Sequence, residues 1–255
     1  MRRWRWPGKG NDKNLANTCG FRKPFSYYHQ SLYSAQPLVR IAVAPPDFEA
    51  NLRKYAGRMW NGLYSHWNWQ GQGPDTLRVF TFSSAERVEL LLNGRSLGQK
   101  SPRDFAERII TWDVPNEPGT LAAVATNAGR VVAVHELVTA GNAVRLELIP
   151  DRSPLLATGQ DLAHVEVRAV DRHGVINPHC QSTAVCTISG PGTIAGVDNG
   201  DLYSPEPFRA RQRELRDGRC LVIVQSTREP GVIRLSARGG GLGTTTIEIP
   251  VLAAV

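Results

Sequence analysis

The sequence predicts a mainly β protein built from two antiparallel β-sandwiches, preceded by a shorter helical and irregular segment. Three observations predict this class. From residue 76 onward, apolar and polar residues alternate with a period of two, as in strands with one buried face. Turn-forming Gly, Pro and Asn residues recur roughly every 8–12 residues, the spacing of a sandwich. Asn93-Gly94 between two such runs is a strong hairpin signal.

The first 60 residues have a different pattern. Residues 1–13 are polar and basic without periodicity, which predicts a disordered or artificial N-terminus. Pro24 suits the first turn of a helix, which we expect to end near Ala35. Residues 38–43 form a short apolar strand, and residues 47–58 are either a short helix or a loop.

The remaining chain divides at Ala140-Gly141-Asn142 into two sets of strands. We therefore assign one sandwich to residues 61–141 and a second to residues 142–255. In the first, strands are predicted at residues 76–82, 87–92, 95–97, 108–114, 120–126 and 130–138. In the second, they are predicted at residues 144–149, 163–171, 184–189, 193–197, 220–225, 232–237 and 244–249.

The stretch from Met59 to Gly73 contains three of the six tryptophans. If it is extended, Trp67 and Trp69 share one face and His66 lies on the other, with Asn68 and Gln70. Indole rings stack on the flat face of a sugar, and short polar side chains bind its hydroxyls, so this pattern is typical of a sugar site. The alternative is that both rings are buried as a wedge between domains.

Composition and charge exclude several classes of function. The net charge of +7 comes from arginines that are scattered among acids, and no recognition helix, zinc-finger spacing or aromatic RNA platform is present. We therefore expect no nucleic-acid partner. No apolar run approaches the roughly 18 residues of a membrane span, so no membrane partner is expected. The N-terminus has no signal peptide, which leaves the localisation open.

The four cysteines, Cys19, Cys180, Cys186 and Cys220, include no Cys-x-x-Cys pair. We expect small buried or surface thiols, no metal and no cofactor. A bridge between Cys220 and either Cys180 or Cys186 stays open, without support from the spacing.

No pair of acids is placed for hydrolysis of a glycosidic bond, which needs two carboxylates on either side of that bond. Glu86 and Glu89 are three residues apart on one strand and face opposite sides. Asp198 and Asp201 lie in a glycine-rich turn, where binding their own backbone is favoured over binding calcium. The other candidate acids, which alternate with apolar neighbours and so face solvent, are Glu136, Glu147, Glu166 and Glu248. The lone histidines His135, His164 and His173 are interpreted as surface or hydrogen-bonded residues.

Several motifs in order resemble one family. They are residues 65–71 (Ser-His-Trp-Asn-Trp-Gln-Gly), 88–98 (Val-Glu-Leu-Leu-Leu-Asn-Gly-Arg-Ser-Leu-Gly), 118–121, 139–141, 159–162, 190–192, 196–201 (Gly-Val-Asp-Asn-Gly-Asp) and 222–227. Over about residues 17–250 the chain resembles the C-terminal half of bacterial glycoside hydrolase family 2 enzymes of the β-galactosidase type. One departure is Asn17, where family members usually have Asp.

The resemblance implies a (β/α)₈ catalytic barrel followed by immunoglobulin-like sandwiches. Residues 14–60 would then be a remnant of the last barrel strand and helix, and the second sandwich would be of the bacterial immunoglobulin-like type. It also implies a retaining mechanism whose two glutamates lie on earlier barrel strands, so no catalytic residue is assigned in this chain. Trp67, with His66, is expected to face the sugar, and Lys23 is a weaker candidate for substrate binding.

The first functional hypothesis is therefore the C-terminal part of a β-galactosidase-like enzyme, inactive alone, whose carbohydrate partner binds through the barrel. The alternatives are a free-standing carbohydrate-binding or adhesion module, and a structural sandwich protein without a ligand. A separated barrel edge also predicts an exposed apolar patch at Tyr27, Tyr28, Leu32 and Leu38. On that basis residues 60–255 alone are expected to be more soluble than the full chain.

Overall fold

The computed structural model describes residues 8–10, 14–49 and 62–254. The described residues fall into two compact units. We call residues 14–17, 21–49 and 62–139 the first sandwich, and residues 8–10, 18–20 and 140–254 the second sandwich. Each unit is described by itself.

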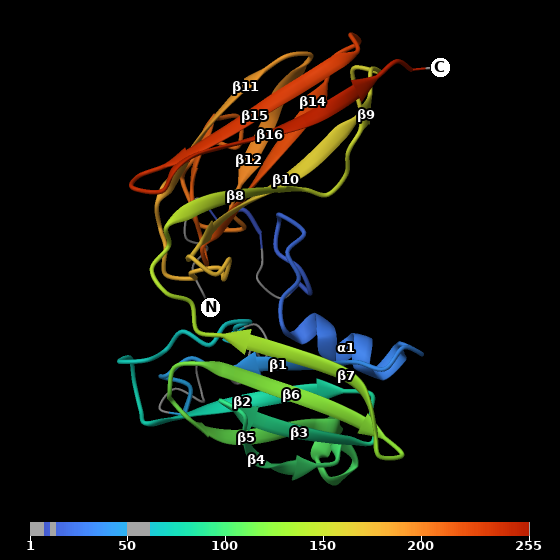
Figure 1. Ribbon diagram of the computed structural model, residues 1–255, viewed down its shortest axis with the longest axis vertical. Helices are drawn as coiled ribbons and strands as arrows, with labels where there is room; N and C mark the ends of the chain where they lie inside the picture. The colour runs from blue at the N-terminus through green and yellow to red at the C-terminus, as the bar shows by residue number, and fades with distance from the viewer. Residues whose placement is uncertain (1–7, 11–13, 50–61, 255) are drawn as a thin grey trace. The chain divides into compact units, whose positions relative to one another are not determined.

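The first sandwich contains two antiparallel sheets (Figure 1). One has the order β1-β2-β5, formed by β1 (Val39–Val43), β2 (Thr76–Ser83) and β5 (Ile109–Pro115). The other has the order β4-β3-β6-β7, formed by β3 (Arg87–Leu92), β4 (Arg95–Lys100), β6 (Thr120–Asn127) and β7 (Arg130–Val138). The apolar core between the sheets includes Ile41, Val79, Leu90, Ile110 and Leu121.

The strand β1 changes the expected domain boundary. It pairs antiparallel with β2, and Ile41 lies opposite Thr81. This strand belongs to residues 14–60, which the sequence analysis assigned to a barrel remnant. Residues 39–43 all lie in the ladder with β2, so the first sandwich begins before residue 61.

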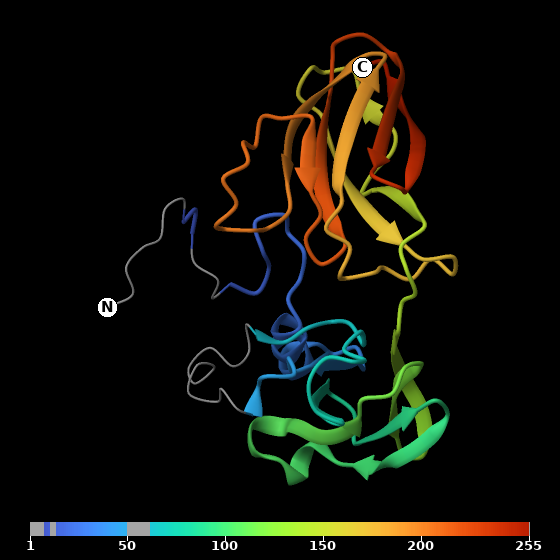
Figure 2. The ribbon, with the colours of Figure 1, turned by 90° about the vertical axis from the view of Figure 1, so that its left-hand side faces the viewer.

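The helix α1 (Phe25–Tyr33) covers the outer face of the β1-β2-β5 sheet (Figures 1 and 2). The ring of Phe82 lies 6.4 Å from that of Phe25 and 5.7 Å from that of Tyr28, centroid to centroid. Phe80 joins this second apolar cluster. The strand β2 is therefore buried on both faces, which is why its residues do not follow a simple inward–outward alternation.

The expected apolar patch on this segment was wrong for three of its four residues. Leu38 is buried, and Tyr27 and Tyr28 are partly buried against the outer cluster around Phe82. Only Leu32 is exposed, and it lies in the last turn of α1. The segment that contains α1 and β1 therefore packs against other residues of the first sandwich.

The second sandwich also contains two sheets. One has the order β12-β14-β10-β8 and the other β13-β11-β15-β16-β9. All pairs are antiparallel except β9 with β16, which is parallel. The strands are β8 (Arg145–Pro150), β9 (Leu155–Leu156), β10 (Leu162–Val170), β11 (Thr183–Ser189), β12 (Gly192–Asp198), β13 (Gln212–Glu214), β14 (Arg219–Ser226), β15 (Gly231–Gly239) and β16 (Gly243–Leu252).

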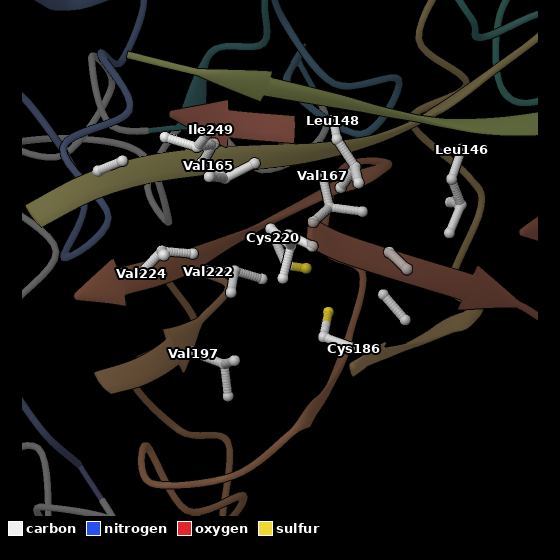
Figure 3. Close-up of a cluster of buried hydrophobic side chains, with 14 of the residues drawn as sticks. Leu146, Leu148, Val165, Val167, Cys186, Val197, Cys220, Val222, Val224 and Ile249 are labelled. Atoms are coloured by element: carbon white, nitrogen blue, oxygen red, sulfur yellow. The ribbon is translucent and has the colours of Figure 1, made fainter. Parts of the chain in front are cut away.

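Figure 3 shows part of the core between these sheets, with Val165, Val167 and Val222 among its aliphatic side chains. Cys186 and Cys220 lie in the same core, and all four cysteines are free thiols.

Every strand predicted from the pattern is confirmed within two or three residues. The hairpin at Asn93-Gly94 is confirmed too, since both residues have positive φ angles of 52° and 78° between β3 and β4. The strands β9 and β13 were missed because they have only two and three residues. Among the described residues, no helix is long and apolar enough to cross a membrane.

Candidate functional site

The aromatic segment expected to bind sugar is part of the first sandwich's core. The side chain of Trp67 is 0% exposed and packs in the cluster between the two sheets. Its indole Nε1 donates a hydrogen bond of 2.8 Å to the carbonyl oxygen of Glu117, and Thr139 Oγ1 donates to the Trp67 carbonyl over 2.8 Å. The expectation that Trp67 faces the sugar was wrong, because neither face of its ring is open to a ligand.

The turn between β5 and β6 holds this segment in place. The side-chain amide of Asn116 donates to the carbonyl oxygens of Trp69, Gln72 and Pro74 over 3.1–3.4 Å. Gln70 Nε2 donates to the Glu117 carbonyl over 3.3 Å. Trp69 is buried in the same core as Trp67, so both rings have a packing role within one unit.

His66 lies in a small ring cluster next to the buried tryptophans. Its ring centroid is 4.7 Å from that of Trp69 and 5.2 Å from that of Tyr64. The amide of Asn68 donates to His66 Nδ1 over 3.3 Å, which leaves Nε2 as the nitrogen that carries the ring proton. The side chain is partly exposed, so His66 retains a surface on which it could meet a ligand.

Lys23 belongs to another segment of the first sandwich. It lies two residues before the helix α1, and its backbone amide donates to the carbonyl oxygen of Leu15 over 2.9 Å. The residue is partly buried. The structure therefore places the three predicted residues in one unit, with Trp67 in its core and with His66 and Lys23 nearer to solvent.

Five of the six glutamates weighed as catalytic candidates have structural partners among the described residues, Glu136 being the exception. Glu86 Oε2 accepts the backbone amide of Ala128 over 2.8 Å, and Glu89 Oε1 accepts the hydroxyl of Ser96 over 2.6 Å. Three others form ion pairs with arginines of their own sandwich: Glu147 with Arg145, Glu166 with Arg168, and Glu248 with Arg234. None of these five carboxylates is paired with another acid, as a glycosidase centre would require.

The glycine-rich turn after β12 binds its own backbone and neighbouring arginines. Asp198 Oδ1 accepts the amide of Asn199 and the guanidinium of Arg213, both over 2.8 Å. Asp201 Oδ1 accepts the amide of Tyr203 over 2.9 Å and lies 2.7 Å from Arg216 Nη1. These contacts favour the turn interpretation over calcium binding. Among the described residues, no group of three His, Cys, Asp or Glu side chains is placed to hold a metal ion.

Arg213, on β13, is a key residue that the sequence analysis missed. Its side chain is 0% exposed, and its guanidinium lies between Asp198 and Glu206, whose carbonyl oxygen it also contacts over 3.1 Å. Burial alone would raise the pKa of Asp198, but hydrogen bonds from Thr18 and backbone amides, with the Arg213 charge, lower it. Leu215, two residues later, is also buried. Because residues two apart on a strand share a face, this alternation was the signal in the sequence that could have predicted the burial of Arg213.

Two family models match the chain. Residues 146–248, in the second sandwich, match the glycoside hydrolase family 2 C-terminal domain 5. Residues 75–133, in the first sandwich, match a domain of unknown function, DUF4982. Each sandwich therefore has its own counterpart among known domains.

Curated relatives match over most of the chain or nearly all of it. A β-galactosidase from Bacteroides ovatus is 33% identical over 244 residues, which are 96% of this chain and 26% of the relative. A β-galactosidase from Thermoanaerobacter pseudethanolicus is 27% identical over 176 residues, which are 63% of this chain and 22% of the relative. The chain thus spans about a quarter of the length of these relatives.

Solved structures give the same result for the fold. A glycosyl hydrolase family 2 member from Bacteroides cellulosilyticus matches with a TM-score of 0.84 and 32% identity, over 94% of this chain and 32% of that one. A β-glycosidase from Bacteroides vulgatus matches with a TM-score of 0.83 and 24% identity, over 96% of this chain and 29% of that one.

Proposed function

We propose that this chain, the C-terminal portion of a glycoside hydrolase family 2 protein, has an accessory role. It forms the β-sandwich region of an enzyme that hydrolyses β-galactosides. The observation that carries the proposal is the 33% identity to the Bacteroides ovatus β-galactosidase over 244 residues. Identity of this extent across both sandwiches links the chain to that enzyme over more than a single domain.

In this proposal, both catalytic glutamates belong to the barrel of the whole protein. A retaining glycosidase needs two carboxylates roughly 5 Å apart, one as acid/base and one as nucleophile. The engagement of Glu86, Glu89 and the arginine-paired acids in the sandwiches supports this division of roles. The two sandwiches then support the barrel and offer it a contact surface, and hydrolysis takes place in the barrel.

The exposed C-terminal end of the helix α1 is the surface that we propose for contact with the barrel. Its inner side packs on Phe82, whereas Leu32 is exposed and Tyr33 is 84% exposed at the end of the helix. Leu15, on the segment before the helix, is also exposed. Apolar side chains at the end of a short helix match what a neighbouring helical layer would cover.

His66 and Lys23 remain proposed sugar-side residues, since both are partly exposed. Their role depends on the barrel. If they act at the sugar, His66→Ala and Lys23→Ala in an active full-length enzyme raise KM for the galactoside, with a smaller effect on stability. The buried Trp67 is not included.

The proposal is tested by transplanting the chain. The aligned region of the Bacteroides ovatus enzyme is replaced by this chain, and hydrolysis of an aryl β-galactoside is compared with that by the same enzyme lacking the region. We expect activity in the chimera and none in the deletion variant. The isolated chain, assayed on a panel of aryl glycosides, is expected to show no turnover.

Two results would contradict the proposal. One is hydrolysis by the isolated chain that follows the protein through a second purification. The other is a folded chimera without activity on any glycoside of the panel. The alternative function, a free-standing carbohydrate-binding module, is tested by titrating the isolated chain with galactosides and following its tryptophan fluorescence. Saturable binding without the barrel would indicate such a module.

A further inference from the structure

Two cysteines of the second sandwich face each other across its core. Cys186 lies on β11 in one sheet, and Cys220 lies on β14 in the other. Figure 3 shows their side chains with the sulfur atoms pointing toward one another. The two residues are 1% and 0% exposed.

The backbone holds both residues firmly. The strand β11 pairs with β13 on one side and β15 on the other, and β14 pairs with β12 and β10. Cys186 lies opposite Ala237, and Cys220 lies opposite Val167. Because both strands are interior to their sheets, the facing arrangement of the thiols is set by the fold and not by mobile loops.

We propose that Cys186 and Cys220 form an inter-sheet disulfide when the second sandwich folds in the presence of a low-molecular-weight disulfide such as oxidised glutathione. Each thiol loses a proton, and a bond forms between the two Sγ atoms. The two electrons released reduce the disulfide of the glutathione, which leaves as two thiols. This modification site is independent of the proposed enzymatic function.

The bridge forms during folding and only slowly afterwards. Thiol–disulfide exchange requires a thiolate. Burial raises the pKa of Cys186 to about 11 and raises that of Cys220 well above its ordinary value. Neither thiol therefore reacts at neutral pH in the folded core, which also excludes the reagent, whereas both react in the unfolded chain.

The two other cysteines are poorer partners. Cys19 lies on the segment 18–20 outside the sheets, and its thiol hydrogen-bonds to Asp198. Burial and that carboxylate raise the pKa of Cys19 to about 12. Cys180 precedes β11 and lies at the margin of the core, where it is only partly buried.

The test is to unfold the 255-residue chain in denaturant and refold it either with excess dithiothreitol or in a glutathione redox buffer. Alkylation and peptide mass spectrometry then count and locate the free thiols. We expect all four thiols free after reducing refolding, and a single Cys186–Cys220 bridge after oxidising refolding. The bridge closes a loop of about 35 residues, so the Tm of the second sandwich rises by roughly 5–15 °C.

Matched variants make the result specific. Cys186→Ala and Cys220→Ala abolish the difference in Tm between the two refolding conditions, whereas Cys19→Ala and Cys180→Ala retain it. Because each variant is compared with itself under the two conditions, a general loss of stability does not affect the outcome. A bridge that maps to Cys19 or Cys180, four free thiols after oxidising refolding, or a bridged form with a lower Tm would overturn the proposal.

Discussion

The backbone amide of Ile41 donates a hydrogen bond of 3.2 Å to Nδ1 of His135. Ile41 lies on β1 in one sheet of the first sandwich, and His135 lies on β7 in the other. The bond therefore joins the two sheets where no backbone ladder connects them. Burial, with the nearby charge of Arg40, lowers the pKa of His135 to about 4.

This hydrogen bond predicts a loss of stability in mild acid. His135 must be neutral to accept the Ile41 amide, and its pKa falls from an ordinary 6.5 in the unfolded chain to about 4 in the fold. The unfolded chain therefore binds more protons between these values. Stability is full above about pH 6.5 and decreases as the pH falls toward 4, by about 3 kcal/mol in total, of which about 2 kcal/mol is lost by pH 5. Urea unfolding of the full chain at pH 7.5 and pH 5 measures this difference in the free energy of unfolding.

The control for this prediction is His135→Gln, whose side chain keeps an acceptor and does not titrate. We expect the variant to lose most of the difference between the two pH values for the transition of the first sandwich. An unchanged pH dependence in the variant would show that other groups cause it.

Arg213→Met is expected to destabilise the second sandwich by about 3–5 kcal/mol, because it leaves the partly buried Asp198 without its cation. Arg216→Met is the matched control, since Arg216 forms an exposed pair with Asp201. Its expected cost is below about 1 kcal/mol. Denaturant unfolding of both variants measures the difference, and equal effects would contradict the central role of Arg213.

Trp67→Ala is expected to cost about 3–5 kcal/mol in the first sandwich, since it removes a fully buried ring and its bond to the Glu117 carbonyl. His66→Ala, on the neighbouring partly exposed residue, is expected to cost about 1 kcal/mol or less. Thermal unfolding distinguishes them. A Trp67→Ala variant with unchanged Tm would restore the interpretation of Trp67 as a ligand-facing residue.

Removing residues 1–59 is expected to lower solubility, the reverse of the expectation drawn from the sequence. The truncation removes α1 and β1, which exposes Phe80 and Phe82 on the outer face of β2 and leaves that strand as a sheet edge. The soluble fraction and binding of an apolar dye are measured for the full chain and for residues 60–255. Higher solubility of the truncated chain would indicate that α1 contributes little to the unit.

Much of the fold could be predicted because strands and hairpins leave local signals. The alternation in β3 and the Asn93-Gly94 turn needed no information from distant residues. The roles of His135 and Arg213 could not be assigned in this way. Each is a residue of a polar type that is often exposed, and only its partner on another strand or loop makes its burial favourable.

The sequence by itself determined the mainly β class, the strand positions and the family resemblance, because these depend on the order and spacing of residues along the chain. The tertiary structure decided which faces are covered. It placed Trp67 in a core and not at a surface, packed α1 against β2, and turned Cys186 and Cys220 toward each other. These outcomes depend on contacts between residues that are distant in the sequence, for which a local pattern carries no signal.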